Sequence, residues 1–226
     1  MFYDPTYLIW VLIPSLVLAA FAQWRVKSSY AKWVKVRNSR GLTGVETAQI
    51  IMRERGLESV GIGRVPGEMT DHYDPRTKTI NLSDSSMGDS VAALSIVAHE
   101  LGHAEQDLTG NAMLNFRTRI VPVANLGSKL SWILIVAGIM MNLLQLSWLG
   151  VLLFAAAVLF TLVTLPVEFD ASRRAKGNLT ALRLVTPAES NGVNAVLNAA
   201  ALTYVAAAAG AVLQLAYWIA VVGRRD

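Results

Sequence analysis

The chain contains no cysteine among its 226 residues. Disulfide bonds are therefore excluded, and so are metal sites built from thiolates. A zinc ion would have to be held by nitrogen and oxygen ligands. Histidine is scarce as well, and the three residues present are His72, His99 and His103, so the choice of nitrogen ligands is narrow.

Charge is also scarce, because only 16% of the residues are charged and 54% are hydrophobic. Soluble domains carry about 25% charged residues. Residues 25–119 have a soluble composition, so the deficit lies in long, nearly uncharged stretches on either side. This distribution is typical of an integral membrane protein.

The basic residues cluster beside the first apolar stretch. Six of the twenty Lys and Arg residues fall between Arg25 and Arg40. Juxtamembrane basic residues orient a helix with its basic end in the cytoplasm and meet anionic lipid. We therefore expect a lipid bilayer, and not nucleic acid, as the partner of this charge.

The apolar stretches predict about four transmembrane helices, since a span needs about 20 residues. The first has no basic leader, unlike a signal peptide, so it is expected to stay as an anchor with its N-terminus outside. The two terminal arginines leave the side of the C-terminus open. The expected organisation is an anchor at 1–24, a cytoplasmic domain at 25–119, a helical hairpin at 120–167 with its turn in "QLSWLG", a polar segment at 168–192 and a last membrane helix at 193–226.

The soluble part predicts a small α+β domain. "TGVETAQIIMRERG" has a capping-box match at Thr43 and Glu46 and a stop signal at Gly56, which favours a helix. "SVGIGRVPG" and "RTKTINLSDS" are rich in β-formers and predict two strands. "DSVAALSIVAHELGHAEQD" predicts a second helix that Asp89 or Ser90 can cap.

The second helix carries a motif that can bind a metal. In "HELGH", His99 and His103 lie four residues apart and Glu100 follows the first. Residues i and i+4 share a helix face, so both imidazoles can reach one ion. The glutamate can reach a water on that ion instead, which is the division of roles in H-E-x-x-H. We predict one zinc ion per chain, with Glu100 as the general base.

A catalytic zinc needs a third protein ligand, and the sequence offers two candidates. One is His72. The other is Glu168, which follows an apolar stretch in "LPVEFDASRRA". A hairpin of two spans returns the chain to the side that it left, so Glu168 is expected on the side of the histidines. This topology favours Glu168, while His72 stays open.

Three segments in order carry a resemblance to a known family. "DHYDP", "HELGHAEQ" and "LPVEFDASRRA", together with the terminal anchor, resemble the YugP-like zinc metallopeptidases over nearly the whole chain. More distantly, "HELGH" followed by "EFDAS" resembles the membrane gluzincins of the HtpX type. The resemblance implies a membrane-embedded zinc peptidase with a zincin-like domain, ligands at His99, His103 and Glu168, and the base at Glu100.

One position departs from the HtpX pattern. In that family an aspartate follows the ligand glutamate by four residues, where it is a partner for a ligand. Here that position is Ser172, and the nearby acid is Asp170. Residues behind the ligands orient ligand histidines. Whether Asp170, Ser172 or neither does so here is open.

The segment before the motif helix suggests a substrate contact. An extended strand at 77–83 could pair with a peptide by β-augmentation. His72 or Tyr73 could then donate a hydrogen bond to the oxyanion that forms on the attacked carbonyl. The alternative is a simple turn at Asp74 and Pro75, with His72 merely exposed.

These features together predict a zinc endopeptidase in the plasma membrane, with a multi-pass topology and its active site on the cytoplasmic side. Its substrates would be segments of membrane-associated proteins. One alternative is a catalytically silent scaffold or adaptor that zinc staples together. Glu100 argues against it, because a structural site has no use for a base. The other alternative is a helical membrane protein without metal.

Overall fold

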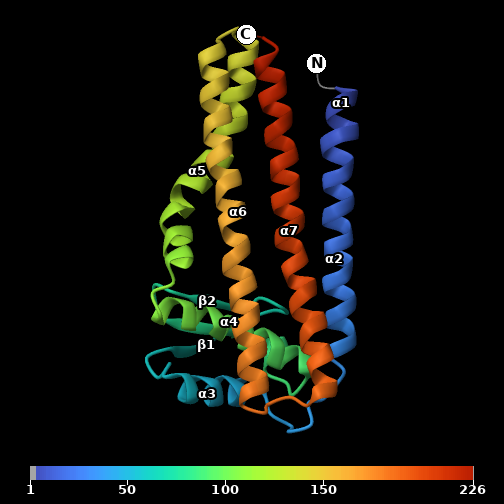
Figure 1. The fold of residues 1–226 in the computed structure, drawn as a ribbon, viewed down its shortest axis with the longest axis vertical. Helices are drawn as coiled ribbons and strands as arrows, with labels where there is room; N and C mark the ends of the chain where they lie inside the picture. The colour runs from blue at the N-terminus through green and yellow to red at the C-terminus, as the bar shows by residue number, and fades with distance from the viewer. Residues whose placement is uncertain (1–3, 226) are drawn as a thin grey trace. The chain divides into compact units, whose positions relative to one another are not determined.

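The structure is a computed structural model that describes residues 4–225, so the first three residues of the expected anchor lie outside it. Its two compact units comprise residues 4–22, 115–166 and 203–225, and residues 23–114 and 167–202. In chain order the helices and strands are α1 (Pro5–Tyr7), the π-helical η1 (Leu8–Leu12), α2 (Ile13–Trp33), α3 (Gly44–Arg55), β1 (Gly61–Val65), β2 (His72–Asp74), β3 (Thr79–Ser83), the 3-10 helix η2 (Asp84–Ser86), α4 (Val91–Leu108), α5 (Ala112–Met140), α6 (Leu144–Ala181) and α7 (Pro187–Gly223) (Figure 1).

The first unit is built from apolar helix segments. Within residues 4–225, four helices are long and apolar enough to cross a membrane: Pro5–Trp33, Ala112–Met140, Leu144–Ala181 and Pro187–Gly223. Many of their large apolar side chains are exposed, including Trp10, Leu126 and Leu152. Contiguous apolar surface of this kind is rare on soluble proteins and suits contact with lipid. The expected mainly α membrane protein with about four spans is confirmed.

Small residues let the helices of this unit approach closely. A Cβ added at Gly127 of α5 would lie 2.7 Å from the Leu153 carbonyl oxygen of α6. A Cβ added at Gly150 of α6 would lie 2.7 Å from the Ser131 carbonyl oxygen of α5. Helices in membranes associate through such small residues, because lipid supplies no hydrophobic drive between them.

The hairpin turn falls earlier than predicted. The chain reverses at residues 141–143, where Asn142 adopts a φ of 55°. Asn tolerates this left-handed conformation better than most residues. "QLSWLG" is helical instead and belongs to the start of α6, so the predicted turn was wrong. The polar segment also continues α6 as far as Ala181, because no proline interrupts the helix between Glu168 and that point.

α3 and α4, the two helices predicted in the soluble part, begin and end close to where the sequence signals predict. Thr43 and Glu46 form the capping box of α3, and Gly56 ends the helix with a φ of 67°. Ser90, not Asp89, caps α4: its hydroxyl accepts a hydrogen bond from the Ala93 N–H over 3.1 Å. The Ser90 cap fixes the start of α4, the helix that carries the motif.

The second unit also contains a three-stranded sheet with the order β1-β3-β2 in the described part of the chain. β1 runs parallel to β3, and β2 runs antiparallel to it, with His72 opposite Asn81. β3 is therefore the central strand, and both of its edges are already paired. The prediction that strand 77–83 pairs with a peptide substrate was wrong for this reason. The short strand β2 was not predicted, and it forms an edge of the sheet.

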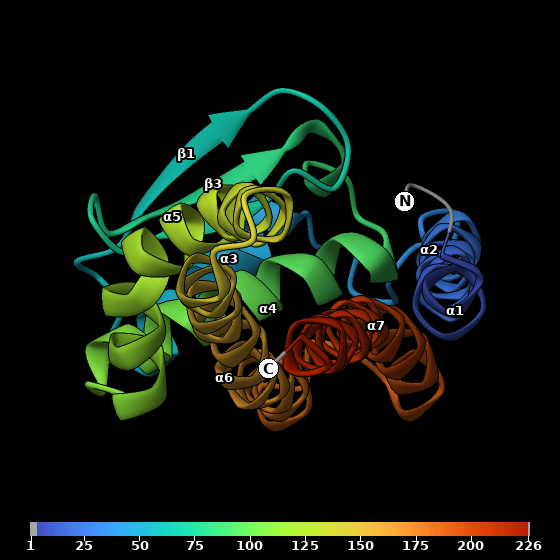
Figure 2. The ribbon, with the colours of Figure 1, turned by 90° about the horizontal axis from the view of Figure 1, so that it is seen from above.

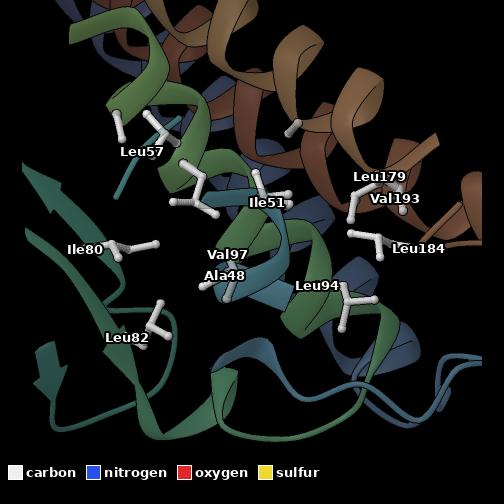
Figure 3. Packing of buried hydrophobic residues seen from close by; sticks show 14 of the residues in the cluster. Ala48, Ile51, Leu57, Ile80, Leu82, Leu94, Val97, Leu179, Leu184 and Val193 are labelled. Atoms are coloured by element: carbon white, nitrogen blue, oxygen red, sulfur yellow. The ribbon is translucent and has the colours of Figure 1, made fainter. Parts of the chain in front are cut away.

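The core of the second unit lies around α4. Ile51 from α3, Leu82 from β3, Leu94 from α4 and Leu179 from α6 are all fully buried in it (Figure 3). Figure 2 shows α4 running between the sheet and the parts of α6 and α7 that belong to this unit. Burial of each such leucine or isoleucine contributes about 1.5–3 kcal/mol. The motif helix is thus held on both sides.

Candidate metal centre

The two motif histidines and the acidic residue of α6 meet in the second unit. His99 Nε2 lies 3.3 Å and His103 Nε2 lies 3.5 Å from Glu168 Oε2. One ligand atom from each residue falls within 4.8 Å of the others. The two imidazole rings stand edge to face, with their centroids 4.9 Å apart. The i, i+4 spacing on α4 produces this arrangement, as the sequence predicts.

A glycine allows α6 to come this close to α4. A Cβ added at Gly102 would lie only 2.5 Å from the carbonyl oxygen of Ala171, the third residue after Glu168. Gly102 lies between the two histidines in sequence, so the helix backbones touch at the level of the site. The glycine of "HELGH" therefore makes room for a neighbouring backbone.

The donor set fits a zinc ion. Two imidazole nitrogens and a carboxylate oxygen form one of the three-ligand sets of catalytic zinc sites. Glu168 is only 2% exposed. Buried carboxylates are costly unless they are paired or bind a metal. Imidazole nitrogens of His99 and His103 face Glu168, and imidazole nitrogen is a common donor to zinc. This cluster could therefore hold one divalent ion.

Glu100 lies beside the cluster but does not belong to it. One carboxylate oxygen accepts a hydrogen bond from the Tyr73 backbone N–H over 2.9 Å. Burial raises the pKa of Glu100, and the nearby histidines and the Tyr73 N–H offset part of that rise. A raised pKa suits a group that accepts a proton and later gives it back.

The pKa of His103 depends on the same buried neighbours. Burial alone lowers the pKa of His103, but its hydrogen bond to Glu168 and the charges of Glu100 and Glu168 outweigh that effect. The net direction is a raised pKa. A proton therefore competes with a metal ion for this imidazole, as it does at metal sites in general.

A polar side chain lies against Nδ1 of each imidazole, the ring nitrogen that does not face Glu168. Ser172 Oγ lies 3.2 Å from His99 Nδ1. Gln106 Oε1 lies 3.0 Å from His103 Nδ1. Asp170 contacts neither ring and instead accepts a hydrogen bond from Gln106 Nε2 over 2.9 Å. The geometry thus pairs Ser172 with His99 and links Asp170 to His103 through Gln106. Sequence reasoning missed Gln106; its place three residues after His103 on one helix was the available signal.

The structure does not bring His72 into the cluster. Its Nδ1 lies 3.0 Å from the Thr70 carbonyl oxygen, and its Nε2 lies 3.3 Å from Asn81 Nδ2. Neighbouring residues of a strand point to opposite faces, and Tyr73 points toward α4. The Tyr73 hydroxyl donates a hydrogen bond to Asp107 Oδ2 over 2.6 Å. Burial and this acidic partner raise the pKa of Tyr73.

The chain matches known sequences along most of its length. Residues 8–223 match the model of a family described as "Putative neutral zinc metallopeptidase". The chain is 44% identical over 208 residues to a curated protein of Bacillus subtilis (strain 168), "Putative membrane protease YugP", and the match covers 92% of both chains. No solved structure matches the chain.

Proposed function

The chain belongs to this family of neutral zinc metallopeptidases, and from that premise we propose that it is a membrane-embedded zinc endopeptidase. The observation that carries the proposal is the meeting of His99, His103 and Glu168 ligand atoms within 4.8 Å, with Glu100 beside them. We propose one zinc ion per chain at this point. When bound, it supplies a polarised water of lowered pKa and a Lewis acid for the substrate carbonyl.

The roles of the chain's own residues follow from their positions. His99, His103 and Glu168 would hold the ion. Glu100 would accept a proton from the attacking water and pass it to the amine that leaves. The Tyr73 N–H holds the Glu100 carboxylate in place for this task. His72 and the Tyr73 hydroxyl remain candidates for oxyanion donation only if they exchange their present partners for substrate.

The placement of the site supports a cytoplasmic active site in a multi-pass plasma-membrane protein. The basic residues from Arg25 to Arg40 and the residues of the metal cluster belong to one compact unit. Basic residues next to a span favour the cytoplasmic side, so the cluster would lie there too. Suitable substrates would be segments of membrane-associated proteins near the membrane surface.

Glu100 separates this proposal from a scaffold that zinc merely staples together. A stapled scaffold needs the three ligands but no base, yet Glu100 lies beside the ligands and is held by the Tyr73 N–H. The description of the family as a metallopeptidase also favours the enzyme.

The test compares purified wild-type protein with the Glu100→Gln variant in detergent. The measurements are zinc content and cleavage of labelled casein and of quenched-fluorescence peptides. We expect about one zinc per chain in both, with cleavage in the wild type only. Glu54→Gln is the matched control, because Glu54 is an exposed acid on α3 and its loss should change neither measurement.

Two results would count against the proposal. A Glu100→Gln variant that cleaves as fast as the wild type would remove Glu100 from the reaction. Zinc in the wild type without cleavage of any of these substrates would favour the scaffold instead.

A further inference from the structure

The side chain of Gln106 connects the two helices of the metal cluster. It is fully buried on α4, and each of its polar atoms has a partner. Its Nε2 donates to the Val167 carbonyl oxygen over 2.8 Å and to Asp170 Oδ2 over 2.9 Å. Its Oε1 lies 3.0 Å from His103 Nδ1. None of these contacts was expected from the sequence.

These partners fix the direction of the amide. A carbonyl oxygen and a carboxylate oxygen only accept hydrogen bonds, so the atom of Gln106 that faces them must be the NH₂ group. The reverse orientation would set the amide oxygen against two other oxygens in a buried site. The oxygen of Gln106 therefore faces His103.

The direction of the amide in turn fixes the proton of His103. An amide oxygen only accepts, so a His103 that binds a metal through Nε2 carries its hydrogen on Nδ1, where it donates to Gln106. A neutral imidazole carries one N–H, and Nε2 is then left with its lone pair. Nε2 is the atom that lies 3.5 Å from Glu168. The lone pair thus points to where the ligand atoms meet.

We propose that Gln106 is a positioning residue, which sets the tautomer and orientation of His103 for the metal and ties it to the helix that carries Glu168. The proposal rests on the zinc site of the proposed function. The carbonyl that Gln106 binds belongs to Val167, the residue directly before Glu168. One side chain therefore aligns a ligand of α4 with the backbone beside the ligand of α6.

Asp170 keeps Gln106 in this position. Arg174 Nε donates to Asp170 Oδ2 over 2.8 Å, and Arg173 pairs with the other carboxylate oxygen. The acid is thereby held with its oxygen at the Gln106 amide. Its influence on His103 passes through that amide, as outer partners of metal ligands commonly act.

His99 is held less strictly. Its partner is the Ser172 hydroxyl, which can both donate and accept. Ser172 therefore does not determine the tautomer of His99, whereas Gln106 determines that of His103. The loss of Gln106 should disturb the site more than the loss of Ser172.

The first experiment determines which ring nitrogen of His103 carries hydrogen. Nuclear magnetic resonance of metal-free protein labelled with ¹⁵N-histidine shows which ring nitrogen carries hydrogen, and three histidines give a simple spectrum. A His72→Asn variant and a His99→Asn variant assign the signals. In a Glu168→Ala variant no carboxylate faces His103 Nε2, so at a pH where the ring is neutral we expect hydrogen on Nδ1 of His103. Hydrogen on Nε2 in that variant would overturn the proposal without any test of Gln106 variants.

The second experiment measures zinc affinity by competition with a chelator. Gln106→Met keeps the size of the side chain but replaces the amide with an apolar thioether and removes its hydrogen bonds, and it should weaken zinc binding about 10–100-fold. Ser172→Ala should weaken it less. Ser95→Ala is the control, because Ser95 is a buried residue of the same helix that bonds only the Val91 carbonyl. Equal zinc affinity in Gln106→Met and Ser95→Ala would contradict the positioning role.

Cobalt substitution gives a readout that a general loss of stability would not move. The absorption bands of bound Co²⁺ report the geometry of its ligands. We expect altered bands in Gln106→Met and unchanged bands in Ser95→Ala; unchanged bands in both would count against the proposal. None of these measurements uses a substrate. A protein that binds zinc and has the expected tautomer but cleaves nothing would refute the proposed function and leave the role of Gln106 standing.

Discussion

The backbone N–H of Tyr73 donates a hydrogen bond to the Glu100 carboxylate over 2.9 Å. Tyr73 lies on β2, so an edge strand of the sheet contacts Glu100, the acid that follows His99. This N–H is not used in pairing with β3, because it faces away from that strand. The sheet thus orients the proposed base by its backbone, with no side chain needed.

Removal of this N–H should slow catalysis. Proline has no N–H and is tolerated on edge strands where that group faces outward, so Tyr73→Pro removes the donor to Glu100. A hydrogen bond to a charged group is worth about 1.5–3 kcal/mol, and loss of its orienting part should lower kcat about tenfold or more. Zinc content should stay at the wild-type level. The measurement is kcat for peptide cleavage beside metal analysis.

Tyr73→Phe is the matched control for that variant. It keeps the backbone N–H and loses only the hydroxyl, which bonds Asp107 in the structure. We expect a kcat close to that of the wild type. If kcat instead fell 100-fold or more, the Tyr73 hydroxyl would be a donor to the oxyanion, because the loss of such a donor typically lowers kcat by about that factor. Equal losses in both variants would show that the backbone N–H is not the cause.

Asp107 anchors the β2–β3 hairpin to α4. It accepts the Tyr73 hydroxyl over 2.6 Å and pairs with Lys78 Nζ at 2.5 Å. Asp107→Ala leaves both donors without this acceptor, and we expect a loss of about 1–3 kcal/mol in stability. Hydrogen exchange should show faster opening of β2 and β3. Arg53→Ala, which breaks an exposed ion pair, should cost at most about 1 kcal/mol. Equal effects of the two would contradict the anchor.

The parts of the fold that could be predicted were those written in local patterns. The capping box at Thr43 and Glu46 and the glycine at position 56 mark a helix by themselves. The spacing of His99 and His103 defines a shared face without any tertiary information. The position of Glu168 required one further step, the return of the chain through a hairpin.

The parts that could not be predicted depend on tertiary neighbours. β2 has three residues, too few to show a period of two. The reversal at Asn142 competed with a longer apolar pattern that continues through it. The link from Gln106 to α6 depends on the carbonyl of Val167, and no pattern within α4 reveals that carbonyl.

Gly102 should be irreplaceable for the metal cluster. A Cβ at this position would lie 2.5 Å from the Ala171 carbonyl oxygen, which is backbone and cannot swing aside. Gly102→Ala must therefore move α4 and α6 apart in this region, at a cost of about 1–3 kcal/mol or more. His99 and His103 would then lie farther from Glu168. We expect a lower thermal midpoint and strongly weakened zinc binding.

Gly177 provides the control for that substitution. It also lies inside a helix, α6, but a Cβ there would meet no atom within 4 Å. Alanine is a better helix former than glycine by about 1 kcal/mol. Gly177→Ala should therefore leave zinc binding intact and raise the thermal midpoint slightly. Wild-type zinc affinity in Gly102→Ala would show that the close contact of the helices is not needed.

Zinc affinity should depend on pH through His103. In the metal-free protein its pKa is raised above the ordinary value of 6.5. The protonated form therefore stabilises the fold below about pH 6.5, and this contribution is lost as the pH rises through the raised pKa. Zinc needs the neutral ring, so its affinity should keep rising with pH beyond the range in which an ordinary histidine has lost its proton.

Calorimetric titration of metal-free protein with zinc at several pH values measures this linkage. We expect proton release on binding that diminishes only above the ordinary histidine range. Bound zinc should also stabilise the second unit, by about 4 kcal/mol at a free concentration 1,000 times the dissociation constant. A chelator should therefore lower the thermal midpoint of the wild type but not that of Glu168→Ala. A zinc affinity that stays constant from pH 6 to 8 would mean that no ligand loses a proton in that range, and it would contradict the raised pKa of His103 as a zinc ligand.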